Sequence, residues 1–173
     1  MDEAEKQSQY ERARELISEQ YFVGAVFVGT LAAGSAAIAY GVTVATWPSV
    51  HGFAVAGIGI VVGLSTATLG RGITSKFSAL AALFTIAACM LGNVIRMIIE
   101  LARATRHSFL QVTHEHSFAA LAENALHYIS PIDFVYWFVA VFAAAFLARR
   151  PLSRSDRLAL RIHAMKPDSR ENL

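Results

Sequence analysis

The chain carries no Asp, Glu, Lys or Arg between Glu19 and Arg71, and this uncharged stretch constrains its fold more than any other feature. Two shorter uncharged stretches follow, at residues 77–95 and 134–148. Roughly 20 apolar residues in a helix cross a hydrocarbon core about 30 Å thick. The first stretch is long enough for two crossings and each of the others allows one, which predicts four transmembrane helices.

A soluble helical bundle is the alternative, but each of its helices would need a charged face. The uncharged stretches are apolar on all sides, and only 16% of the chain is charged, against about 25% in ordinary soluble domains. A net charge of +2, without a basic patch interleaved with aromatic residues, gives no reason to expect nucleic acid as a partner. We therefore expect an all-α integral membrane protein surrounded by the lipid bilayer.

Three segments are expected: residues 1–20 as a cytoplasmic amphipathic segment, residues 21–149 as the transmembrane domain, and residues 150–173 as a basic cytoplasmic tail. The four helices of the domain should cover about residues 21–44, 53–69, 77–103 and 131–149. Pro48 breaks the chain between the first two, because proline cannot continue a helix. The sequence Ser-Pro-Ile-Asp at residues 130–133 starts the last helix, with serine at the N-cap and proline in the first helical position.

Both chain ends are expected to form amphipathic helices outside the membrane. The apolar face near the N-terminus comprises Tyr10, Ala13, Leu16 and Ile17. In the tail helix, at residues 153–165, the apolar face comprises Leu158, Ile162 and Met165, and three arginines lie opposite.

Basic residues are distributed unevenly between the two sides of this predicted bundle. Twelve of the fifteen Lys and Arg residues fall at the chain ends or in the loop at residues 70–76. Arg103 and Arg106 fall on the other side, and Arg96 lies near its boundary. The positive-inside rule therefore predicts a multi-pass protein with both termini in the cytoplasm and an outer loop at residues 104–130.

Small residues recur at every fourth position of the first two helices. They are Gly29, Ala33, Ala37 and Gly41 in the first helix, and Gly59, Gly63 and Ala67 in the second. Small side chains allow helix backbones to approach closely in a membrane, where lipid is as apolar as leucine. We expect the two helices to pack together through these rows; the alternative is an alanine-rich composition without a packing role.

Polar side chains line one face of the third helix. They are Thr85, Cys89, Asn93, Arg96, Glu100 and Arg103, spaced three or four residues apart. Such groups in a membrane segment are costly and often mark a pathway or a partner. The functional interpretation is a solute route with Asp133 facing Arg96. The structural interpretation is that Arg96 snorkels to the surface, Asn93 forms an interhelical hydrogen bond, and Asp133 caps its own helix.

Histidines gather in the outer loop, where metal candidates are His107, His114, His116 and His127. His114 and His116 are two residues apart, which suits an extended segment and turns Glu115 to the opposite side. A zinc site needs three or four ligands, so these two would need His107, His127 or a second subunit. A pH-responsive loop and a solvated loop without a special role remain open beside metal binding.

Motifs for catalysis are missing from the sequence. It has no Gly-x-Ser-x-Gly, no second cysteine beside Cys89, and no phosphate-binding glycine loop, since Gly70-Arg71-Gly72 is too short. We therefore expect neither an enzyme nor a cofactor.

Three stretches carry a resemblance to known proteins: YGVTVATWPSVHGFAVAGIGIVVGLSTATLGRG, FSALAALFTIAACMLGNVI and SPIDFVYWFVAVFAAAF. Together they resemble an uncharacterised class of small bacterial four-span inner-membrane proteins. That resemblance implies the four-span fold and assigns no functional residues.

The expected function is that of a non-enzymatic structural or accessory membrane protein. It would act by helix association in the bilayer, as a homo-oligomer or with another membrane protein. One alternative is a small oligomeric channel or transporter with a polar path along the third helix. Another is an envelope sensor of metal or pH that uses the histidine-rich loop.

Overall fold

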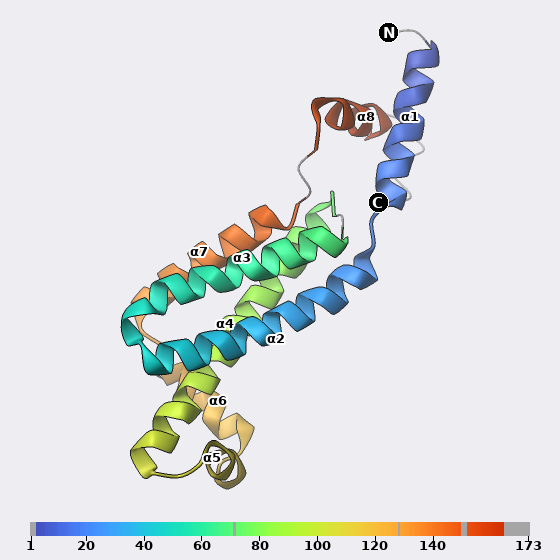
Figure 1. Cartoon of the computed structure of the whole chain (residues 1–173). Coiled ribbons are helices and arrows are strands. Elements are labelled where there is room, and N and C mark those ends of the chain that lie inside the picture. Colours follow the sequence, from blue (N-terminus) through green and yellow to red (C-terminus); the bar gives the residue numbers. More distant parts are fainter. Residues whose placement is uncertain (1–2, 71, 128, 150–151, 165–173) are drawn as a thin grey trace.

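A computed structural model describes residues 3–70, 72–127, 129–149 and 152–164, and these residues are all helical or in short connections (Figure 1). The elements in chain order are α1 (Glu3–Ser18), α2 (Phe22–Thr46), the 3-10 turn η1 (Pro48–Val50), α3 (His51–Gly70), α4 (Ser75–Thr105), α5 (Phe109–Glu115), α6 (Phe118–His127), α7 (Pro131–Leu147) and α8 (Arg154–Ala164). Arg71, Tyr128 and residues 150–151 and 165–173, which include the end of the expected tail, lie outside the described residues.

Three segments of the described chain are long and apolar enough to cross a membrane: Phe22–Thr46, Pro48–Gly70 and Ser75–Thr105. The fourth expected span is different, because α7 has only 17 residues. Alone it is shorter than those three segments, and together with α6, from which it is bent by 106°, it is long and apolar enough for a fourth span. The described residues therefore include three helices suited to a membrane, or four if this bent pair is one span.

Helices α2, α3, α4 and α7 pack side by side into one bundle (Figure 1). Its interior is filled mostly by small or medium side chains, including Ala37, Val62, Ala88 and Ala144, all 1% exposed or less. Its outer surface carries large apolar side chains such as Phe27, Phe53, Leu83 and Phe138. This arrangement is the one expected for helices surrounded by lipid, which pack through small residues and turn large apolar groups outward.

The glycines of the two rows make their closest contacts with helices other than the predicted pair, although Gly29 also lies near Thr66 of α3. A Cβ on Gly41 would meet Ile95 and the Gly92 carbonyl of α4 at 2.7 and 2.8 Å. A Cβ on Gly59 or Gly63 would meet the backbone of α7, at Ala140 or Ala144. Although α2 and α3 do contact each other, the first row packs mainly on α4 and the second on α7. The spacing shows that a helix approaches closely, but it does not show which helix.

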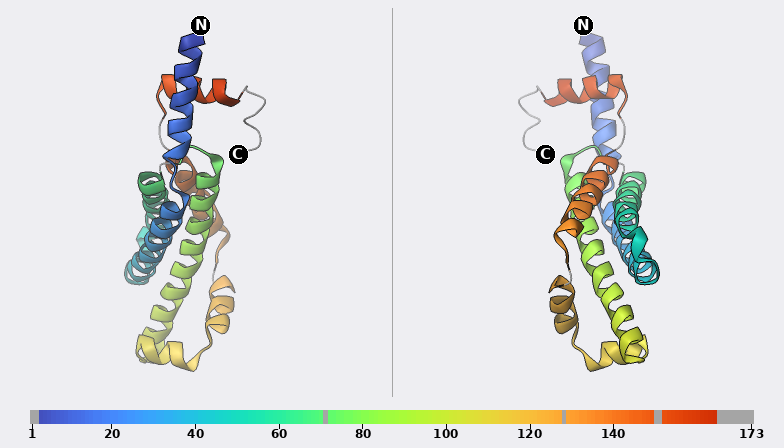
Figure 2. Two further views of the ribbon diagram at one scale, coloured as in Figure 1. Left: turned by 90° about the vertical axis from the view of Figure 1, so that its right-hand side faces the viewer. Right: turned by 90° about the vertical axis from the view of Figure 1, so that its left-hand side faces the viewer.

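At one end of the bundle, which we call the α6 end, α4 continues beyond its neighbours to meet α5 and α6 (Figure 2). Arg106, with a φ of 59°, ends α4. Ser108 then starts α5 by accepting a hydrogen bond from Gln111 N, and Ser108 N donates to Gln111 Oε1. A separate small core holds this part together: Val94, Ile98, Val112, Leu121 and Ala125.

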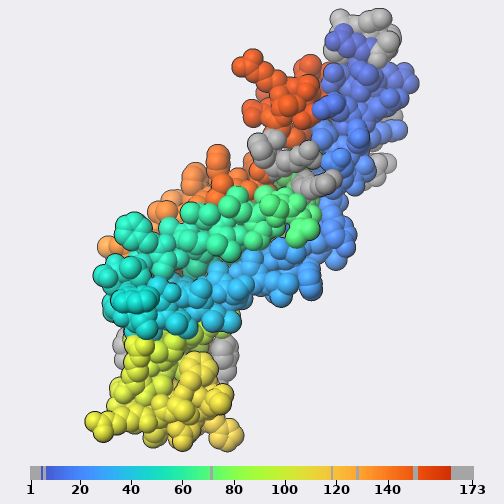
Figure 3. All heavy atoms as spheres, in the orientation of Figure 1, coloured from blue at the N-terminus to red at the C-terminus, as the bar shows by residue number. Residues whose placement is uncertain are grey.

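At the opposite end, which we call the α8 end, α1 and α8 pack against each other (Figures 1 and 3). Arg12 Nε donates to Asp156 Oδ1 at 2.7 Å. Ala13 and Leu16 are buried, as the apolar face of α1 predicts. In α8 the buried residue is Ala159, whereas Leu158, expected on the apolar face, is 48% exposed. The buried face of α8 is therefore centred on Ala159, one residue after the Leu158 that the hydrophobic pattern indicates.

Candidate functional site

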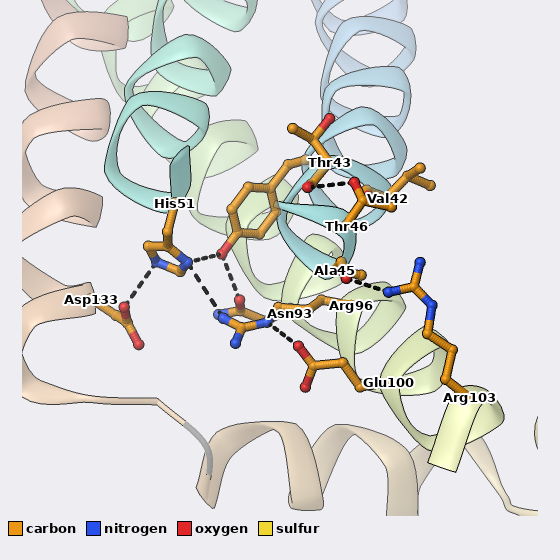
Figure 4. Close-up of polar contacts among 11 residues, drawn as sticks. Val42, Thr43, Ala45, Thr46, His51, Asn93, Arg96, Glu100, Arg103 and Asp133 are labelled. Carbon is orange, nitrogen blue, oxygen red and sulfur yellow. Dashed lines mark hydrogen bonds and ion pairs between the residues drawn. The ribbon is translucent and has the colours of Figure 1, made fainter. Parts of the chain in front are cut away.

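Five polar side chains from four helices meet inside the α6 end of the bundle (Figure 4). Tyr40 comes from α2, His51 is the first residue of α3, Asn93 and Arg96 come from α4, and Asp133 lies in the first turn of α7. We call these five residues the polar cluster. The turn between α2 and α3 positions His51, because η1 begins at Pro48 and leads directly into α3 at His51.

His51 lies at the centre of the polar cluster. Its Nε2 is 2.9 Å from Asp133 Oδ1, and both side chains are almost enclosed, at 14% and 11% exposed. The approach is off the axis of a well-aligned hydrogen bond, and Nε2 has no hydrogen-bond partner in the described part of the chain. On its other side, His51 Nδ1 is 3.4 Å from Arg96 Nη1. The imidazole thus links α4 to α7.

These contacts determine the form of the imidazole. A guanidinium nitrogen only donates, so His51 Nδ1 must offer its lone pair to Arg96. The proton then sits on Nε2, facing the Asp133 carboxylate, and the ring is neutral. A second proton, on Nδ1, would point at an N–H of Arg96 and displace that contact.

Tyr40 and Asn93 form the deeper part of the polar cluster. The Tyr40 hydroxyl donates to Asn93 Oδ1 at 2.7 Å, between α2 and α4. The interhelical hydrogen bond predicted for Asn93 is therefore confirmed. Because the hydroxyl has one proton, Tyr40 cannot also donate to His51 Nδ1, which is 3.5 Å away.

Arg96 does not face Asp133 directly, as the functional interpretation of the stripe expected, because His51 lies between them. Arg96 Nε instead donates to Glu100 Oε1 at 2.8 Å, one turn along α4. Arg103 donates to the carbonyl oxygen of Ala45, near the end of α2. That carbonyl is one of the last of its helix and has no partner further along α2.

Asp133 has two roles. Its Oδ2 accepts a hydrogen bond from Ser130 N at 2.8 Å, which confirms the predicted start of the last helix. Its Oδ1 faces His51. With His51 neutral, the polar cluster and Glu100 together carry one net negative charge, and a proton on His51 would cancel it.

The polar stripe of α4 does not continue from Asn93 toward the α8 end as an open path. Thr85 and Cys89 are fully buried in the apolar core. The Thr85 hydroxyl donates to Ala81 O of its own helix, and Thr66 of α3 donates likewise to Val62 O. Within one copy of the chain, the described residues therefore form no polar path from the polar cluster toward the α8 end.

The four histidines of the loop lie on or beside short helices. His114 belongs to α5 and is not in the extended segment we predicted, because the Ser108 cap starts a helix there. His107 Nδ1 is 3.4 Å from Glu115 Oε2, while His116 follows α5 and His127 ends α6. In the described part of the chain, no three His, Cys, Asp or Glu residues are placed to hold a metal ion.

Tyr40 and His51 are the members of the polar cluster that sequence reasoning missed. The available signal was a lone histidine inside the longest uncharged stretch of the chain. An ionisable group within a membrane segment needs a partner.

No protein-family model, curated protein or solved structure matches this chain. A function must therefore be inferred from the arrangement of its own residues.

Proposed function

We propose that this chain is a non-enzymatic accessory protein with four membrane crossings and both termini in the cytoplasm. It associates with another membrane protein or with a second copy of itself. The observation that carries this proposal is the α1–α8 pair, which joins the two ends of the chain outside the bundle.

The four crossings are α2, the η1–α3 segment, α4 and α7. With 17 residues, α7 spans about 25 Å at 1.5 Å per residue, and it lies alongside α3 and α4. Arg149 and the arginines of α8 are at the α8 end, so the positive-inside rule directs this end to the cytoplasm. The bacterial inner membrane is the proposed location.

The α1–α8 pair has features of a surface that binds protein. A polar hollow of about 470 Å³ on it is lined by residues of both charges, including Glu11, Arg12 and Glu15. Gln9 also lines the hollow, and its Oε1 is buried without a donor in the described part of the chain. Leaving a buried acceptor unpaired costs roughly 1–3 kcal/mol.

Association through the small-residue rows receives less support. Gly41, Gly59 and Gly63 already contact helices of the same copy. We therefore propose that the partner or second copy binds the α1–α8 pair and not the small-residue rows.

A charge exchange tests this proposal. Arg12→Asp and Asp156→Arg should each separate α1 from α8 and reduce co-purification of a partner or second copy from cross-linked native membranes. The double variant restores an opposite-charge pair and should regain the association. Arg14→Asp is the matched control, because Arg14 is an exposed arginine of the same helix.

Three outcomes would contradict the proposal. The wild-type protein could be monomeric and without a partner in native mass spectrometry after cross-linking. The two single variants could retain the partner as fully as Arg14→Asp does. The double variant could fail to recover what the single variants lose.

A small oligomeric channel or transporter is the second candidate, favoured by the buried ionisable groups of the polar cluster. Since Thr85 and Cys89, beyond Asn93 on α4, are buried in the apolar core of one copy, a route would need residues from another copy. Flux into liposomes that is unchanged by Asn93→Leu and by Arg96→Gln would remove this candidate.

A further inference from the structure

A large groove lies at the α8 end, lined by residues of α3, α7 and α8 together with Leu152. Its volume is about 1400 Å³, beyond the roughly 300–1,000 Å³ of pockets that hold small molecules. A ligand that fills it must therefore be large or elongated.

The deep wall of the groove is apolar. Leu64 of α3 and Phe142 and Phe146 of α7 line it, and the two phenylalanines are 66% and 72% exposed. Phe142 lies seven residues before Arg149, which corresponds to about 10 Å along a helix. The wall thus runs from the end of α7 into the part of the bundle that lies in the membrane.

The mouth of the groove is cationic. Arg149 and Arg157 both line it. Arg149 Nε donates to Ser78 Oγ at 2.8 Å, and Ser78 Oγ donates in turn to Ala145 O at 2.7 Å. This tether holds the guanidinium in place while using one of its five N–H donors.

Arg157 and Glu19 complete the charges of the lining. Arg157 Nε donates to Leu152 O at 3.3 Å. Glu19 is the acidic residue of the lining, and it is already held in an interaction of its own. The mouth therefore offers two guanidinium groups to an anion.

We propose that this groove binds an anionic phospholipid of the leaflet at the α8 end. The phosphate lies between Arg149 and Arg157, since guanidinium groups pair with phosphate through parallel hydrogen bonds. One acyl chain lies along the wall formed by Leu64, Phe142 and Phe146. A soluble anion would leave this wall uncovered, and an apolar helix would leave the arginines without a counter-charge.

Native mass spectrometry of the full-length protein tests this assignment, with phosphatidylglycerol and phosphatidylcholine of identical acyl chains as the probes. The wild-type protein should retain phosphatidylglycerol preferentially. Arg149→Gln and Arg157→Gln should each weaken its retention about five-fold, the effect of one juxtamembrane cation on an anionic lipid. Arg161→Gln is the matched control: this exposed arginine of α8 is not part of the lining.

The apolar wall has its own test. Phe142→Ala should weaken phosphatidylglycerol retention, whereas Phe134→Ala, at the other end of the same helix and 60% exposed, should not. Arg157 has no bond to the bundle among those described, so its variant keeps the test valid even if Arg149→Gln unfolds the protein. Equal retention of the two lipids by the wild type would overturn the proposal. So would an Arg157→Gln variant that binds phosphatidylglycerol as tightly as Arg161→Gln does.

Discussion

Replacing Gly59 by alanine tests how closely α3 approaches α7. A Cβ there would lie 2.1 Å from the carbonyl oxygen of Ala140 and 2.7 Å from its carbonyl carbon, whereas ordinary contact begins at about 3.4 Å. Because the obstacle is backbone, no side-chain rotation relieves the clash, and α7 must move by more than an ångström. Overpacking of a close-packed interior typically costs about 1–3 kcal/mol. We expect Gly59→Ala to lower the free energy of unfolding in detergent micelles by this amount.

Gly57 provides the matched control, two residues away on the same helix. A Cβ on Gly57 would meet nothing within 4 Å. Alanine is favoured over glycine in a helix interior by roughly 0.5–1 kcal/mol, so Gly57→Ala should leave stability unchanged or raise it. Both variants are compared with the wild type in one denaturant titration. Equal stability of the two variants would refute the close approach of α3 and α7.

Three further predictions concern other parts of the molecule. A double-mutant cycle with Tyr40→Phe and Asn93→Leu should give a coupling energy of about 0.6 kcal/mol and not above about 1.7 kcal/mol, the average and the maximum for interhelical hydrogen bonds in membranes. Ser153, which hydrogen-bonds the carboxyl group of Asp156, and Arg12 hold the pKa of Asp156 below its usual 3.8. The stabilisation from the Arg12 pair is therefore complete above pH 3.8 and lost only as the pH falls through the lowered value, which spin labels on α1 and α8 should report as a distance increase confined to that range. Cys89 is fully buried, so a membrane-permeant maleimide should label it only when denaturant unfolds the bundle.

The parts of the fold that depend on composition and on local signals could be predicted from the sequence. Uncharged stretches located the apolar helices, because a charged side chain in lipid is costly wherever it occurs. Pro48 and the Ser-Pro-Ile-Asp run at residues 130–133 marked chain breaks through backbone geometry alone. Helix α5 was missed because its seven residues depend on a cap between Ser108 and Gln111 that no hydrophobic period reveals.

The partners of each helix could not be predicted in the same way. A row such as Gly59 and Gly63 indicates only that some backbone passes nearby, and α7 and α2 are equally compatible with it. The choice is made by the summed packing of the bundle, in which Ala140 and Ala144 of α7 match the spacing of the α3 row. The alanines of α7 therefore indicate the packing partner of α3 as well as its glycines do, but only when the two helices are compared with each other.

His51 was missed because Pro48, two residues after the end of α2, suggests a loop, and a histidine in a solvated loop needs no partner. The 3-10 turn shortens that break, so α3 begins two residues earlier than its hydrophobic stretch and carries the imidazole into the bundle. Once there, the ring needs an acceptor for one nitrogen and a donor for the other, and Asp133 and Arg96 supply them. From the sequence, Asp133 at the start of α7 was expected to cap its own helix, and Arg96 of α4 was expected to reach toward the membrane surface. His51 of α3 contacts both Arg96 of α4 and Asp133 of α7, so the two local roles belong to one cluster.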